Sequence, residues 1–285
     1  MEDILSRFME SEKDPEQMND KYPGDIILNF MIAGKDTSAN TLSWFFYMIS
    51  KNPLIQEKVA QEVKDVVCMK HDADIDEFVT NITDATLEKM QYLHATLTET
   101  LRLYLAVPVN GKFAEVDDIL PDGFRVKKGD GIAYMAYAMG RMPYIWGEDA
   151  EDFQPERWLN NGVFKPESPF KFIAFHLYLG YSQAGPRTCL GKDFAYMQIK
   201  IVAMALLCFF RFKLAEETRN VITYRTMFTL SHRWHPPYAC TSKDHLTDCF
   251  HMKQKSFPSK MNVLSLSLSL SVSSTSILDH GNQLH

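Results

Sequence analysis

One cysteine of this chain stands in a glycine-bounded loop before a predicted helix, a position suited to metal ligation. The loop reads Gly185-Pro186-Arg187-Thr188-Cys189-Leu190-Gly191. Unpaired N–H groups and the positive end of a helix dipole stabilise a thiolate there, and the thiolate is the form of cysteine that ligates metals. Gly191 leaves room for a flat ligand, and Arg187 supplies a fixed positive charge suited to a carboxylate. Taken alone, such a cysteine is more often a small buried hydrophobe.

A hydroxyl and a carboxylate lie side by side in a second candidate site. Asp36 and Thr37 follow small residues in the stretch Ala33-Gly34-Lys35-Asp36-Thr37-Ser38. In a loosened helix, this pair can hold a water molecule and pass protons to a bound reactant. The alternative is an ordinary helix in which the threonine hydroxyl bonds back to the preceding turn.

Three charged residues form the third candidate group. Glu99 and Arg102 are three positions apart in a segment with helical spacing, and Arg157 lies in Pro155-Glu156-Arg157-Trp158. An isolated Glu–Arg pair at this spacing is usually a solvated pair that contributes only about 0.2–0.5 kcal/mol. The pair alone therefore predicts no function.

Taken together and in their order along the chain, the motifs resemble those of the cytochromes P450. GPRTCLG is similar to the GxRxCxG centre of that family's haem-binding loop, and AGKDTS is similar to its distal-helix motif. Glu99 and Arg102 match the ExxR motif, and PERW resembles the PERF-type segment. The stretch from Tyr22 to Leu230, including VPVNGKFA and DDILPDGFRVKKGD, is closest to the plant fatty-acid hydroxylating clan.

The resemblance implies a catalytic role for three residues. Cys189 would be the axial ligand of the iron in haem b, and the electron-rich thiolate would favour cleavage of iron-bound dioxygen. Asp36 and Thr37 would deliver the protons that this cleavage consumes.

The remaining candidate residues would bind the haem or stabilise the fold. The haem-binding residues implied by the resemblance are Gly185, Gly191, Arg187 and Lys112. The two basic residues among them would contact the haem propionates. The residues of a buried structural lock, without a part in catalysis, would be Glu99, Arg102 and Arg157.

By the same resemblance, the protein is expected to be a haem-dependent monooxygenase. It would insert one oxygen atom from O2 into a lipophilic substrate, specifically a long-chain fatty acid, with electrons from NADPH passed on by a cytochrome P450 reductase. It would act at the cytosolic face of the endoplasmic reticulum membrane. Because the match begins just before the distal helix, the chain is predicted to lack the family's N-terminal membrane anchor.

Two departures from the family pattern support a different prediction. Residues 177–183 are inserted between Phe175-His176 and Ala184-Gly185, and this insertion is expected to displace the loop's phenylalanine from the cysteine. After Leu230 the sequence no longer resembles the family and runs into a Ser-Leu repeat. The alternative function is therefore a truncated, catalytically inactive cytochrome P450 fragment with impaired haem binding.

Composition excludes several other classes of protein. Of the 285 residues 46% are hydrophobic, which suffices for a sizeable core. The 30 Lys and Arg against 36 Asp and Glu give a formal charge of −6, which disfavours nucleic acid as a partner. The 5 cysteines are an odd number without a CxxC pair, which argues against a disulfide framework and a zinc site.

The spacing of apolar residues predicts the elements that position these sites. Helices are expected over residues 25–50, 53–68, 86–105 and 190–210, and short strands with tight turns over 109–140. In the last helix, the apolar residues expected to share one face are Ile201, Ala205, Leu206 and Phe209. The fold class is therefore mainly α with a small β-sheet, a partial cytochrome P450 fold from the distal helix to the haem-ligand helix.

The chain is expected to divide into three parts. Residues 1–21 form a short polar leader, and residues 22–230 form the C-terminal portion of a cytochrome P450 domain with the insertion at 177–183. Residues 231–285 form a tail outside the family pattern, and this tail is expected to be disordered because its Ser-Leu repeat has no predicted pairing partner.

Overall fold

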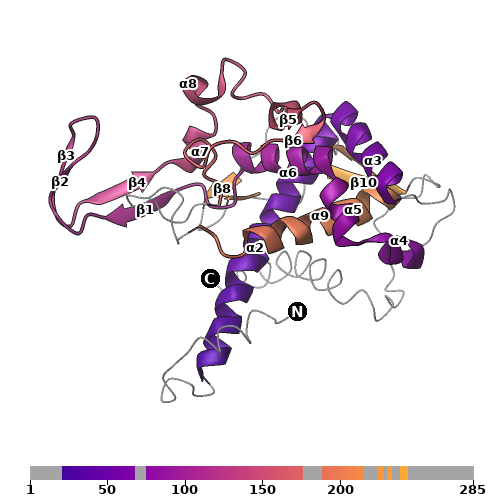
Figure 1. The fold of residues 1–285 in the computed structure, drawn as a ribbon, viewed down its shortest axis with the longest axis horizontal. Helices are drawn as coiled ribbons and strands as arrows, with labels where there is room; N and C mark the ends of the chain where they lie inside the picture. Colours follow the sequence, from indigo (N-terminus) through magenta and orange to yellow (C-terminus); the bar gives the residue numbers. More distant parts are fainter. Residues whose placement is uncertain are drawn as a thin grey trace, which may run out of the picture.

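Helices make up most of the described chain, and its strands are short (Figure 1). The computed structural model describes residues 21–67, 75–175, 188–214, 224–226, 230–232 and 238–242. Within these ranges the strands form separate antiparallel pairs. The predicted fold class, mainly α with minor β structure, is confirmed.

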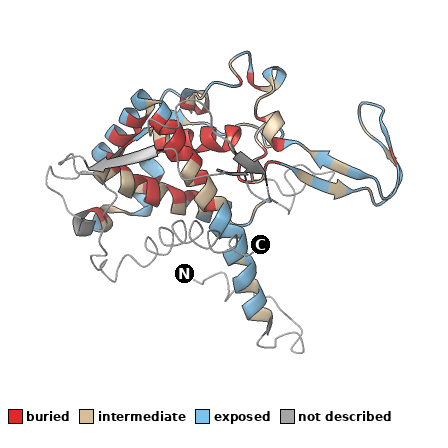
Figure 2. Cartoon of the chain, turned by 180° about the vertical axis from the view of Figure 1, so that it is seen from behind, coloured by how far each residue is buried: buried red, intermediate tan, exposed pale blue. Residues whose placement is uncertain are grey.

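A long helix and its neighbour form one side of the body. Helix α2 spans Lys21–Lys51 and α3 spans Pro53–Val67. Pro53 suits the first turn of α3 because its missing N–H has no partner to lose there. Residues 44–49 of α2 are buried, whereas the first half of α2 is exposed and projects from the body (Figure 2). None of the described helices combines the length and apolar character needed to cross a membrane.

The helix predicted over residues 86–105 is in fact two helices. These two helices are α5 (Asp84–Lys89) and α6 (Gln91–Leu103). The short helix α4 (Ile75–Asn81) precedes them. Between them Met90 has a ψ of 76°, outside the helical range.

A cap from another helix accounts for this break. The Glu62 carboxylate on α3 accepts the N–H groups of Tyr92 and Leu93, each at 2.7 Å, and so satisfies the start of α6. Apolar spacing predicted one continuous helix because a cap supplied from elsewhere in the fold leaves no local sequence signal.

A two-part β-arm extends from the body after α6 (Figure 1). Strand β1 (Asn110–Phe113) pairs with β4 (Gly131–Tyr134), and β2 (Asp118–Ile119) pairs with β3 (Arg125–Val126). Gly123, with a φ of 89°, makes the turn between β2 and β3 in a conformation that favours glycine. These strands lie in the region where the sequence predicts them.

Short elements fill the segment between the β-arm and the last helix. They are helices α7 (Ala136–Met139) and α8 (Pro143–Trp146), the 3-10 helix η1 (Pro155–Trp158), and the paired strands β5 (Leu159–Asn160) and β6 (Val163–Phe164). Their side chains pack on α6, which is the element that carries Glu99 and Arg102.

The last helix, α9 (Lys192–Phe209), packs against α2, α3 and α6. Its buried residues are Tyr196, Ile199, Val202, Ala203, Met204 and Leu207. The four residues predicted to share one face are half-buried and pack against the edge of the core, beside the fully buried side. Since the helix is apolar on most sides, spacing could not single out the side that meets the core.

Strands follow α9 directly. Strand β7 (Phe210–Leu214) pairs with β10 (Tyr238–Ser242), and β8 (Tyr224–Thr226) pairs with β9 (Leu230–His232). Strand β10 lies within the tail predicted over residues 231–285 and pairs with β7, and the disorder expected of this tail stays a prediction. Residues 1–20 of the leader predicted over 1–21, and the Ser-Leu repeat, lie outside the described residues.

Candidate functional site

The half-buried Cys189 directly precedes α9, and its backbone is held on both sides. Its N–H donates to the Phe175 carbonyl oxygen at 2.9 Å, and its own carbonyl oxygen accepts the N–H of Lys192 at 3.2 Å. Gly191 is the N-cap of α9, and a Cβ on it would meet nothing within 4 Å. The thiol forms no disulfide. A sulfur outside any disulfide at a helix start is suited to metal ligation.

The phenylalanine that the insertion was expected to displace stays next to the cysteine. The hydrogen bond between Phe175 and Cys189 holds the two ends of the loop together. This bond keeps the Phe175 backbone beside Cys189, whereas the displacement of its ring from the sulfur stays a prediction. The inserted residues 177–183, with Gly185 and Arg187, lie outside the described residues, and their roles stay predictions.

Asp36 and Thr37 lie in α2, where its exposed half meets its buried half. Asp36 is exposed, and the Thr37 hydroxyl donates to the Ala33 carbonyl oxygen at 2.6 Å. The helix is continuous through both residues, and a Cβ on Gly34 would meet nothing within 4 Å. This back-bond is the one that an ordinary helix would make, although the hydroxyl oxygen keeps its capacity to accept a hydrogen bond.

Lys112 lies in the β-arm. It is half-buried on β1 and stands opposite Ile132 of β4. The strand pairing fixes its backbone, and its predicted contact with a haem propionate stays a prediction.

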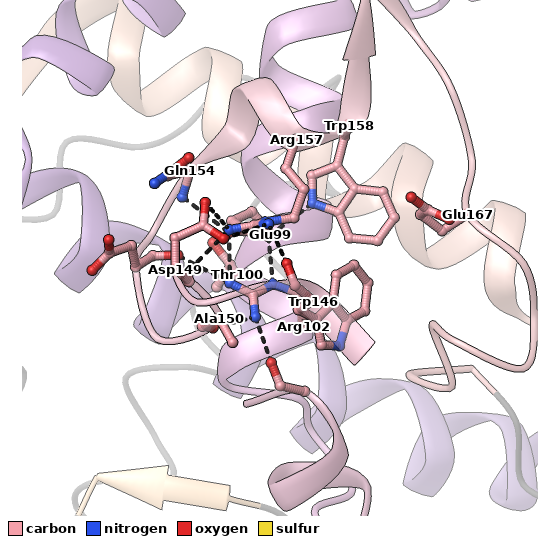
Figure 3. Close-up of polar contacts among 12 residues, drawn as sticks. Glu99, Thr100, Arg102, Trp146, Asp149, Ala150, Gln154, Arg157, Trp158 and Glu167 are labelled. Carbon is pink, nitrogen blue, oxygen red and sulfur yellow. Dashed lines mark hydrogen bonds and ion pairs between the residues drawn. The ribbon is translucent and has the colours of Figure 1, made fainter. Parts of the chain in front are cut away.

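A fully buried ion pair lies at the centre of the third candidate group, which consists of Glu99, Arg102 and Arg157 (Figure 3). The side chains of Glu99 and Arg102 are 0% exposed. Arg102 donates from Nε and NH2 to the two Glu99 oxygens, each at 2.8 Å, which is the strong bidentate geometry. Its remaining donors reach the carbonyl oxygens of Gly140, Ala150 and Asp152. With these bonds the buried guanidinium is fully paired, which the burial of a charge requires.

Arg157 joins this pair from η1, so the three charged residues lie together. Its Nε is 3.5 Å from Glu99 Oε1, and its NH1 donates to the Trp146 carbonyl oxygen at 3.0 Å. Arg157 also hydrogen-bonds the Asp149 carboxylate and thereby lowers the pKa of that carboxyl below its ordinary value. The cluster thus connects α6 to the segment around α8 and η1.

Two further donors to Glu99 were missed from the sequence. The buried Trp158 indole N–H donates to Glu99 Oε2 at 2.8 Å, and the Gln154 backbone N–H donates to Oε1 at 2.9 Å. Trp158 had a usable signal, since it directly follows Arg157 and a buried indole needs an acceptor. Gln154 had none, because it acts through its backbone.

His94, on the same helix as Glu99, lies between aromatic rings. Its ring centroid is 4.1 Å from that of Phe164 and 4.4 Å from that of Tyr196. Its Nδ1 is buried without a hydrogen-bond partner among the described residues. Burial lowers the pKa of His94 to about 3, so the imidazole is neutral at physiological pH. A cavity of about 300 Å³ adjoins it, and none of the described residues that line this cavity belongs to α2.

Comparison with known proteins agrees with the motifs. The sequence profile of the cytochrome P450 family matches residues 1–238, and the chain belongs to that family. This confirms the family predicted from GPRTCLG, ExxR and the two other motifs.

Plant proteins of this family are similar to the chain. Cytochrome P450 704C1 of Pinus taeda is 53% identical over 80% of this chain and 44% of its own length. Cytochrome P450 704B1 of Arabidopsis thaliana is 46% identical over 80% of this chain and 46% of its own length. Alkane hydroxylase MAH1 of Arabidopsis thaliana is 39% identical, with 69% of this chain and 35% of its own length covered. The chain thus spans less than half the length of these relatives.

Proposed function

We propose that this chain carries the haem-ligand portion of a cytochrome P450 monooxygenase, with Cys189 as the axial ligand of the iron. The observation that supports this most is the free Cys189 thiol before α9, held by backbone bonds on both sides. A lone thiolate holds a metal only when the metal brings its other ligands, as the iron of haem b does. Among the described residues, no group of three His, Cys, Asp or Glu side chains offers another metal site.

The surroundings of Cys189 fit a haem in chemistry and in space. Open space lies beside Gly191 before α9 and beside Gly34 on α2, and these two helices pack against each other. A flat macrocycle needs such glycine-lined room. Arg187 and Lys112 would pair with its propionates, and Gly185 would let the loop approach it.

The residues of the chain would divide the work of oxygen activation. A bound haem with a thiolate ligand supplies the activation of dioxygen. The N-terminus of α9 would stabilise the negative charge of a Cys189 thiolate bound to the iron. Asp36 would supply protons from solvent, and the Thr37 hydroxyl oxygen would accept a hydrogen bond from the water that carries them.

We propose a long-chain fatty acid as the substrate. One atom of O2 would enter a C–H bond and the other would leave as water, which consumes two electrons and two protons. The support is the name of one relative, an alkane hydroxylase, which points to long apolar chains. Exposed apolar side chains on α2 suit such a chain, and they are Ile27, Leu28, Met31 and Ile32.

The electron source and the location follow from the family. NADPH would provide the two electrons through cytochrome P450 reductase. The protein would act at the cytosolic face of the endoplasmic reticulum membrane. Both stay proposals, since the chain spans less than half the length of the relatives compared.

Spectroscopy of the haem-loaded chain tests the ligand. After haem addition and reduction under carbon monoxide, ligation by Cys189 predicts the strongly red-shifted Soret band of a thiolate complex. Cys189→Ala removes this band. Cys208→Ala is the matched control, since Cys208 is a second half-buried cysteine without a disulfide and lies within α9, and this variant keeps the band.

The second candidate function is a truncated, inactive cytochrome P450 fragment with impaired haem binding. The exposed apolar half of α2 supports it, because exposed apolar patches favour aggregation over a folded active state. A wild-type chain that takes up haem without the red-shifted band would establish this alternative and refute ligation by Cys189.

A further inference from the structure

A series of contacts connects α6 to the loop of Cys189 through a buried tyrosine. Tyr196 lies on the core face of α9, and its hydroxyl is 3.0 Å from the hydroxyl oxygen of Thr98 on α6. Thr98 donates its own hydrogen to the His94 carbonyl oxygen at 2.8 Å. Because a threonine hydroxyl has one hydrogen, Tyr196 is the donor in the bond between the two hydroxyls. Burial raises the pKa of Tyr196, so it keeps the proton that this bond needs.

Phe175 is the next contact in this series. Its ring centroid is 5.1 Å from that of Tyr196 with an interplanar angle of 44°, within the range of favourable aromatic pairs. On its other side, the Phe175 carbonyl oxygen accepts the Cys189 N–H at 2.9 Å. Phe175 is therefore held by Tyr196 through its ring and holds Cys189 through its backbone.

We propose that Tyr196 is a positioning residue for Cys189 and that it acts through Phe175. Tyr196, on α9, holds the Phe175 ring in place, and the Phe175 carbonyl then holds the backbone of Cys189. Thr98 directly precedes Glu99, so the helix that carries the buried ion pair also orients Tyr196. That this positioning serves haem ligation rests on the proposed function. The contacts themselves involve only residues of the chain.

The test measures alkylation rates of Cys189 and Cys208 in the haem-free chain, resolved by mass spectrometry of the labelled peptides. Cys208 is half-buried on α9 and reports opening of the whole helix. Tyr196→Leu keeps apolar bulk but removes the ring and the hydroxyl. We expect it to raise the rate at Cys189 by about two- to tenfold relative to Cys208, the range that loss of one aromatic pair gives.

Two companion variants separate positioning from general destabilisation. Met204→Ala truncates another buried residue of α9, roughly two turns beyond Tyr196, and should change the Cys189 and Cys208 rates together. Tyr196→Phe keeps the ring and should keep the Cys189-to-Cys208 ratio within about twofold of wild type. The proposal is overturned if the Cys189-to-Cys208 ratio is unchanged in Tyr196→Leu. It is also overturned if Met204→Ala raises this ratio as much as Tyr196→Leu does.

A variant at the half-buried Phe175 and the haem-loaded spectrum complete the test. If Tyr196→Leu does not fold, Phe175→Leu must give the same rise in the ratio, and an unchanged ratio overturns the proposal. A rise in the ratio in a chain whose wild type lacks the red-shifted carbon monoxide band refutes the proposed function and supports positioning. A wild type with that band but no rise in the variant refutes positioning alone.

Discussion

The buried cluster around Glu99 and the first half of α2 differ in which groups they place in an unfavourable environment. The cluster takes charged groups out of water and provides each with partners, from the bidentate Arg102 pair to the Trp158 indole. The first half of α2 leaves large apolar groups in water, with Met31 59% and Ile32 65% exposed. One region satisfies its polar groups internally, and the other leaves its apolar side chains exposed to water.

This difference predicts which region contributes most to the free energy of unfolding. A satisfied buried network is costly to break at any one member, because the remaining charges stay buried without their partner. An exposed helix face contributes little to the free energy of unfolding, because it loses no packing when it is changed. We therefore expect large effects of substitution around α6 and small ones on the first half of α2.

The largest effect is expected from Glu99→Ala. This change leaves the Arg102 guanidinium buried without its carboxylate and deprives Trp158 of its acceptor, so the free energy of unfolding should fall by about 3–5 kcal/mol. Urea denaturation followed by circular dichroism measures the loss. Glu57→Ala is the control, since Glu57 pairs with Arg211 at the surface, and it should cost no more than about 1 kcal/mol. Equal losses in the two variants would contradict a lock at Glu99.

Glycine substitutions are expected to have opposite signs in the two regions. A Cβ on Gly140 would overlap the Arg102 carbonyl oxygen, so Gly140→Ala should lower the free energy of unfolding by about 1–3 kcal/mol. A Cβ on Gly34 would meet nothing within 4 Å, and Gly34→Ala should raise the free energy by about 0.5–1 kcal/mol because alanine favours the helix. Denaturant titrations of both variants check the signs, and a stabilising Gly140→Ala would show that the close approach is absent.

Sequence reasoning succeeded where a side chain acts through a recognisable motif. Glu99, Arg102 and Arg157 were identified from ExxR and PERW, and α2 and α3 were located by the apolar run and the break at Asn52. The motif also identified Cys189 as the candidate ligand. In each case a local pattern carried the information.

The sequence was uninformative where the backbone or a distant residue decides. The Glu62 cap that starts α6 comes from another helix, and the carbonyl of Phe175 holds Cys189 across the insertion. The core face of α9 is set by its packing on three helices, since its own composition is apolar on most sides. Such contacts are properties of the assembled fold and leave no local spacing to recognise.

The pH dependence of stability is expected to reflect His94, whose buried Nδ1 has no hydrogen-bond partner among the described residues. Burial lowers the pKa of His94 from 6.5 to about 3 in the folded chain, so the unfolded chain binds the proton more readily between these values. The free energy of unfolding should therefore fall as the pH falls from about 6.5 towards 3. His94→Phe keeps a ring between Phe164 and Tyr196 and should make this fall shallower. Urea titrations at several pH values measure the difference, and parallel curves for wild type and variant would show that His94 is not buried as neutral imidazole.

The smallest effect on stability is expected on the first half of α2. Met31→Lys combined with Ile32→Glu should change the free energy of unfolding by no more than about 0.5 kcal/mol, because both side chains lie in water. The matched control is Ile49→Ala on the same helix, whose side chain is fully buried and whose truncation should cost about 2–5 kcal/mol. The double variant should also reduce self-association in sedimentation experiments, since it removes part of an apolar patch. A loss of stability comparable to that of Ile49→Ala would mean that this half of α2 is packed in solution, and the contrast with the Glu99 cluster would then not hold.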